Sequence, residues 1–121
     1  MNPFSRFLTQ WSGDASLKAF VAHWDLLEAL VIRVYKGAAA SEDDDAQWRE
    51  HSSWLRERYP PWRQRLAPHW RQATVGGEPA KEDPFLRLLS AERAAEFVGD
   101  WQALQNLPAA REALNRLLLE A

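Results

Sequence analysis

The sequence predicts an all-α protein, a single compact bundle of five to seven helices formed by residues 1–121 as one domain. Proline and glycine divide the chain into segments whose apolar residues recur every three or four positions, which is the period of an α-helix. No segment alternates apolar and polar residues between turns at hairpin spacing, as paired strands would. The length of 121 residues is typical of one domain with its own hydrophobic core.

A short helix is expected at the N-terminus. Asn2-Pro3 is typical of a helix start, because asparagine caps the free backbone N–H groups and proline is tolerated in the first turn. An apolar stripe follows at helical spacing: Phe4, Phe7, Leu8 and Trp11.

The next helix is the longest apolar segment, near residues 15–36. Asp14 or Ser16 caps its start, and Gly37 ends it after about Lys36. Apolar residues cover much of its circumference, a pattern typical of a helix surrounded by other helices. We therefore expect this helix at the centre of the bundle.

Prolines divide the middle of the chain. Ser41 and the acidic residues 42–45 predict a helix start, since carboxylates favour the positive end of the helix dipole. That helix is expected to end near Arg58, because the residue before Pro60-Pro61 avoids the helical conformation. A second helix should follow and kink or split at Pro68.

The last third begins with a predicted flexible loop at about residues 75–82, where glycine and proline are concentrated. Asp83-Pro84 then predicts a helix that reaches Val98 and ends at Gly99. After a short turn, Pro108 is expected to start the final helix.

Composition excludes several classes of function. The chain has no cysteine, which excludes disulfides and thiolate chemistry and favours a cytoplasmic location. No targeting segment or membrane span is visible, so we expect no membrane partner. No catalytic motif is present, and the three histidines follow no metal-ligand spacing, so neither cofactor nor metal is expected.

The most unusual stretch is residues 47–72, which hold four of the seven tryptophans and six arginines against two glutamates. Such tryptophans could form core, a protein interface or a stacking surface for nucleic acid. The net charge of −2 argues against nucleic acid. The leading hypothesis is a small non-enzymatic helical interaction module, a homodimer or a partner of another protein, with this predicted contact surface: Trp48, Trp54, Arg56, Arg58, Trp62, Arg63 and Trp70.

Glu28 supports an alternative hypothesis, because it lies within the apolar arc of the long helix. A carboxylate there must be paired, or its pKa must rise. It could line a ligand-binding or catalytic pocket, or it could form an ion pair with one of the arginines. Glu92 and Glu96 lie one helical turn apart, but the Glu-x-x-His pattern of metal-binding bundles is missing. The predicted pocket comprises Glu28, Trp24, Tyr35, Glu92 and Glu96.

Overall fold

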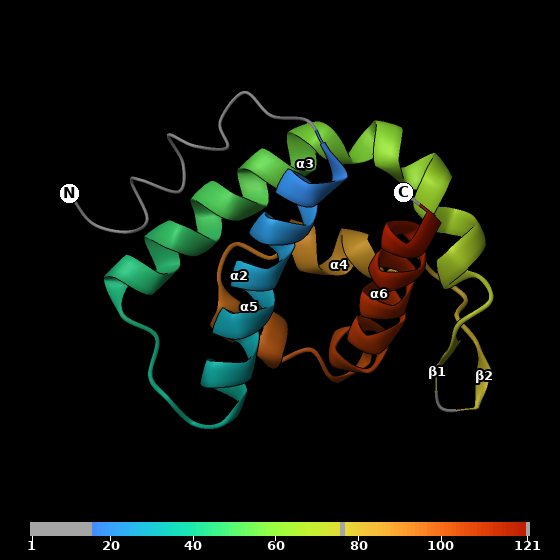
Figure 1. Cartoon of the computed structure of the whole chain (residues 1–121). Helices are drawn as coiled ribbons and strands as arrows, with labels where there is room; N and C mark the ends of the chain where they lie inside the picture. The colour runs from blue at the N-terminus through green and yellow to red at the C-terminus, as the bar shows by residue number, and fades with distance from the viewer. Residues whose placement is uncertain (1–15, 76, 121) are drawn as a thin grey trace.

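The structure is a computed structural model that describes residues 16–75 and 77–120. Within these ranges the protein is mostly helical, as the sequence predicts, with five helices and one pair of short strands (Figure 1). The helix predicted from Asn2-Pro3 lies outside the described residues. The elements are α2 (Leu17–Tyr35), α3 (Glu42–Trp70), β1 (Thr74–Val75), β2 (Glu78–Pro79), α4 (Pro84–Ser90), α5 (Ala94–Val98) and α6 (Trp101–Glu120).

Three helices begin at side-chain caps. The Ser16 hydroxyl accepts a hydrogen bond from the Ala19 N–H at 3.2 Å at the start of α2. Ser41 and Asp44 cap each other's backbone N–H groups at the start of α3. Asp83 accepts from the backbone of α4. The predicted starts at Ser41 and Asp83 are confirmed. Ser16 caps α2, and the other candidate, Asp14, lies outside the described residues.

Helix α3 corrects the predicted division of the middle segment. It continues through Pro60-Pro61 and Pro68, where a break and a kink or split were expected. Figure 1 shows it as one helix that arches as it packs against α2, α4 and α6. Burial of apolar side chains on both sides of the prolines stabilises the helix despite the hydrogen bonds that proline cannot donate. These side chains include Leu55, Tyr59 and Leu66.

The C-terminal segment differs from the prediction in three places. The expected helix from Pro84 to Val98 is two helices, because the chain is extended at Ala91, whose carbonyl accepts a hydrogen bond from Trp48 Nε1 at 2.8 Å. Helix α6 begins at Trp101 and runs through Pro108 instead of starting there. The predicted loop at 75–82 contains part of an antiparallel strand pair, β1 with β2.

Large side chains from α2, α3, α4 and α6 form one core. Its fully buried members include Phe20, Trp24, Trp48, Leu55, Phe85, Leu88 and Leu114. Helix α3 packs against α2, α4 and α6, and α2 also packs against α5. None of the helices in the described ranges is both long and apolar enough to cross a bilayer.

Candidate functional site

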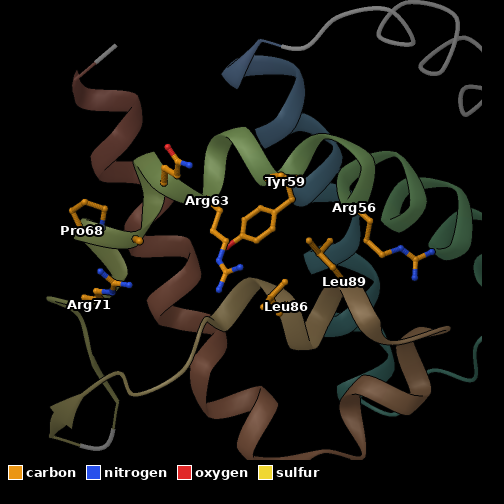
Figure 2. Close-up of a pocket in the computed structure, with 10 residues that line it drawn as sticks. Arg56, Tyr59, Arg63, Pro68, Arg71, Leu86 and Leu89 are labelled. Carbon is orange, nitrogen blue, oxygen red and sulfur yellow. The ribbon is translucent and has the colours of Figure 1, made fainter.

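An open groove with a volume of about 730 Å³ lies between α3 and α4 (Figure 2). We call it the α3–α4 groove. Its lining residues come from α3 with its C-cap Arg71 and from α4. None of these lining residues is acidic, and three are arginines: Arg56, Arg63 and Arg71.

The three arginines follow one face of α3. They are separated by seven and eight residues, which is close to two helical turns. Figure 2 shows Arg63 extending from α3 toward α4, with Arg56 and Arg71 at the two ends of the groove. Arg56 and Arg71 are exposed, and the Arg71 guanidinium lies 5.5 Å from the centre of the Trp70 ring. Arg56 and Arg71 therefore place positive charge at the two ends of the groove, about four helical turns apart, and Arg63 between them pairs with Asp83.

The floor of the groove is apolar. Tyr59, Ala67 and Leu89 are almost fully buried, whereas Leu86 of α4 remains 40% exposed. Leu86 thus offers an aliphatic contact between the arginines. A groove with an apolar floor and a cationic wall suits a ligand that is itself amphipathic and acidic.

A buried hydrogen bond fixes the two walls of the groove relative to each other. The Tyr59 hydroxyl of α3 donates to Asp83 Oδ2 at 2.5 Å, and Asp83 caps α4 through the Phe85 N–H at 2.9 Å. Burial, together with the Asp83 carboxylate, raises the pKa of Tyr59, so the phenol remains a donor at all ordinary pH values. Arg63 also pairs with Asp83 at 3.4 Å. Asp83 therefore ties both Tyr59 and Arg63 of α3 to the start of α4.

Two prolines add hydrogen-bond acceptors to the same face. Pro60 and Pro68 line the groove, and neither has an N–H group. The carbonyls of Arg56 and Gln64, four residues before each proline, therefore receive no helical hydrogen bond from that position. The residues that carry these two carbonyls, Arg56 and Gln64, both line the groove.

The structure divides the predicted contact surface between core and groove. Trp48, Trp54 and Trp70 are buried, with exposed fractions of 0, 8 and 6%. Trp54 lies off the apolar stripe of its segment, but its ring stacks on His23 at 3.7 Å between ring centres. These tryptophans therefore pack in the core and present no surface.

The remaining predicted contact residues lie on or near the outer face of α3. Arg56 and Arg63 line the α3–α4 groove. Trp62 is half-buried, and Arg58 covers the outer side of the Trp54 ring, 4.1 Å from its centre. The sequence missed Gln64, Arg71 and the α4 residues of the groove, although the spacing of arginines and prolines along α3 was a usable signal.

Glu28 forms an ion pair. Its carboxylate accepts from Arg111 of α6, with Nη2 at 2.7 Å and Nε at 3.1 Å, and from Trp24 Nε1 at 2.8 Å. Asp25 also pairs with Arg111, at 2.5 Å. The ion-pair alternative therefore describes Glu28, and the pair joins α2 to α6.

Of the other predicted pocket residues, only Trp24 contacts that ion pair, through its indole N–H. Trp24 is in the core, and Tyr35 is 62% exposed at the end of α2. Glu92 and Glu96 are exposed, and a 3.4 Å hydrogen bond from the Glu92 N–H links them. Within the described part of the chain, no hydrogen bond or ion pair joins Glu28 to either of them. No group of three or more histidine, aspartate or glutamate side chains in the described ranges could hold a metal ion.

The sequence also missed a buried histidine pair. His23 Nδ1 and His51 Nδ1 lie 2.8 Å apart, and both side chains are fully buried between α2 and α3. Burial lowers the pKa of His23 to about 3, with contributions from His51 and Arg58, and lowers that of His51 to about 4. The two residues belong to different helices, so no spacing in the sequence could reveal their contact.

No family model, curated protein or solved structure matches this chain.

Proposed function

We propose that this protein is a small non-enzymatic helical interaction module and that the α3–α4 groove is its protein-binding surface. The observation that carries the proposal is the groove's lining, which combines three arginines and an exposed leucine with no acidic residue. Arginine is enriched among the residues that dominate protein interfaces, and concave preformed sites lose little entropy on binding. The buried Tyr59–Asp83 hydrogen bond supports such preorganisation.

A nucleic-acid ligand fits the groove less well. Proteins that bind single strands stack bases on exposed aromatic rings. In this groove the aromatic lining residue is Tyr59, which is only 3% exposed. The chain as a whole also carries a net charge of −2, which gives no long-range attraction to a polyanion.

A ligand-binding or catalytic pocket around Glu28 has less support than the groove. The carboxylate is engaged by the Arg111 guanidinium and the Trp24 indole N–H. A catalytic acid or base needs a substrate within hydrogen-bond reach of a free lone pair or proton. The pairing gives Glu28 a structural role between α2 and α6.

Site-specific photo-crosslinking in cells tests the proposed surface. A benzoylphenylalanine incorporated in place of Gln64, inside the groove, should yield discrete protein adducts, whereas the same group in place of Lys18 on α2 should not. The Gln64 adducts should disappear in the R56E/R71E background. Adducts that are equal at both positions, or that persist in R56E/R71E, would contradict the proposal, as would a complete absence of adducts at Gln64.

Self-association remains part of the proposal, and we assign it to a different face. A groove of about 420 Å³ between α2 and α6 has an apolar lining that includes Ile32, Tyr35 and Trp101, which are 49, 62 and 64% exposed. Exposed apolar patches of this kind mark interaction sites, and aromatic residues are enriched at their centres. A second copy is the proposed occupant, because a two-fold axis would bring the same aromatic residues of both copies together.

Light scattering after size exclusion measures that association. The wild-type protein should show a dimer mass at high concentration, and W101S should shift the equilibrium toward monomer. L119S is a matched control, because Leu119 is 87% exposed on α6 but does not line this groove. A monomer at all concentrations, or equal effects of both substitutions, would rule out this face.

We also make a proposal about the domain organisation and the cellular location of the protein. We propose that the whole chain folds as one compact bundle in the cytoplasm. Support comes from a single core cluster that includes residues of all five described helices, and from the absence of cysteine in the chain.

A further inference from the structure

We infer that the α3–α4 groove binds an acidic amphipathic α-helix of a partner protein, with carboxylates on that helix spaced two turns apart. The inference rests on the proposed function, since it names the partner of the same groove. It goes further by specifying the secondary structure, the charge and the spacing of the bound segment.

The spacing of the arginines indicates a helical partner. Arg56, Arg63 and Arg71 are separated by about 10 and about 12 Å along the axis of α3, given a rise of about 1.5 Å per residue. A partner helix that lies along α3 has the same rise, so acidic residues seven or eight positions apart would meet successive arginines. Guanidinium groups bind carboxylates through two parallel hydrogen bonds, which makes this register specific.

The apolar floor favours a helix over an extended acidic chain. Leu86 lies between Arg56 and Arg71 in Figure 2 and is 40% exposed, and the buried Ala67 and Leu89 also line the groove. An amphipathic helix can place a leucine or methionine three or four residues from each carboxylate, on the same face. A helix also satisfies its own backbone hydrogen bonds internally.

The freed carbonyls distinguish a protein helix from a phosphate backbone. The carbonyls of Arg56 and Gln64 lack their helical donors because Pro60 and Pro68 carry no N–H group. Serine, threonine, asparagine or lysine side chains of a partner can donate to such carbonyls. Phosphodiester groups have no donor to offer at neutral pH, so these carbonyls favour a polypeptide over a phosphate backbone.

Fluorescence anisotropy with three defined probes tests the inference. The first probe is a labelled 22-residue helical peptide that carries leucines on one face and three glutamates, seven and eight residues apart, on that same face. The second has the same composition with the glutamates moved around the helix. The third is a 20-nucleotide deoxythymidine strand. The first peptide should bind about tenfold more tightly than the second, and the DNA should bind more weakly than either.

Two double variants with equal charge change locate the binding. R56E/R71E should lower the affinity for the first peptide at least about tenfold. The control variant R65E/R93E should bind the first peptide with an affinity within about twofold of the wild-type value. Arg65 and Arg93 are exposed and do not line the groove, and Arg65 stacks on Trp62 at 5.1 Å much as Arg71 stacks on Trp70 at 5.5 Å. If circular dichroism shows that R56E/R71E is unfolded, R56Q/R71Q takes its place.

The outcomes separate failure of the inference from failure of the proposed function. If both peptides bind equally well and R56E/R71E weakens both, the proposed spacing of carboxylates on the partner helix is wrong. The groove would still be the binding surface. Tighter binding of the DNA, falling steeply with salt, would overturn the protein partner. Equal effects of R56E/R71E and R65E/R93E, or no binding of the first peptide, would overturn the inference, and equal effects would also count against the groove.

Discussion

His23 and His51 meet inside the protein where α2 crosses α3. Their Nδ1 atoms lie 2.8 Å apart, so one imidazole donates and the other accepts, an arrangement that requires at least one neutral ring. The flat contact between His23 and Trp54, 3.7 Å between ring centres, encloses the pair on one side. Arg58 adds a positive charge nearby, which disfavours protonation of His23 further.

Stability should therefore fall as the solution becomes acidic. The folded pKa values of about 3 for His23 and about 4 for His51 lie below the value of 6.5 expected on unfolding. Their contribution is complete above pH 6.5 and is lost as the pH falls, because only the unfolded chain takes up the protons. Each proton contributes a slope of about 1.4 kcal/mol per pH unit. Urea unfolding at pH 7.5, 6.0 and 5.0 measures this slope.

The variant H51Q tests whether the histidines cause this dependence of stability on pH. H51Q removes one titrating group and should reduce the slope between pH 6.0 and 5.0 relative to wild type. The pKa values of Asp44 and Asp100 are lowered by hydrogen bonds to backbone N–H groups, so these carboxylates lose their contribution only at lower pH. An unchanged slope in H51Q would show that other groups set the pH dependence.

The Glu28–Arg111 pair is a second test at the residue scale. Glu28→Gln keeps the shape of the side chain but removes the charge that faces Arg111. We expect a loss of about 1–2 kcal/mol in the free energy of unfolding, less than for a fully buried pair, because Arg111 is 30% exposed and keeps Asp25. Asp25→Asn should lower the free energy of unfolding by less than Glu28→Gln does, since Asp25 is 54% exposed. Equal costs in urea unfolding would contradict this ranking.

Residue-scale features were predictable only in part. The apolar arc around Glu28 indicated that its charge needs a partner. The identity of that partner, Arg111, was not predictable, because it lies 83 residues away on another helix. The same limit applies to Tyr59 with Asp83 and to His23 with His51. In each case the side chains are brought together by helix packing that sequence periodicity does not encode.

At the scale of elements, α3 is the unusual helix. It holds three prolines in 29 residues and remains continuous. Local propensity favours a break at each proline, but the apolar residues on both sides are buried against the same core. The helix therefore bends instead of ending, and its proline face forms the wall of the groove.

Pro68→Ala should stabilise the protein. Pro68 is exposed, so its ring contributes little packing, and alanine restores the hydrogen bond to the Gln64 carbonyl. We expect a gain of about 1 kcal/mol in the free energy of unfolding, below the full propensity difference because the helix is already bent to accommodate the ring. Urea unfolding checks the sign. A loss of stability would mean that the bend at Pro68 is required by the packing.

Helix starts were predicted better than helix continuations. Ser41 and Asp83 cap helices through local hydrogen bonds that the sequence contains in full. Gly37, with φ of 101°, follows α2 where expected, because glycine adopts this conformation without strain. The break at Ala91 and the passage of α6 through Pro108 were missed. The break at Ala91 accompanies a long-range contact, the hydrogen bond from the Trp48 indole to the Ala91 carbonyl.

At the scale of the whole molecule, charge is unevenly distributed although the net charge is only −2. Helix α3 begins with four consecutive acidic residues, Glu42–Asp45, and its second half carries the arginines of the groove. The excess of arginine between residues 47 and 72 was evident in the sequence. That Trp48, Trp54 and Trp70 are buried in the core while Arg56 and Arg63 line a groove follows from the packing of the helices.

The central claim is that the α3–α4 groove is the binding surface of this protein. Chemical-shift mapping tests it most directly, with ¹⁵N-labelled protein titrated with the helical peptide that carries glutamates two turns apart. The expected result is that the largest shifts fall on the amides of residues 56–71 and 86–89. Shifts concentrated instead at residues 31–36 and 101–107, or spread evenly over the molecule, would contradict the claim.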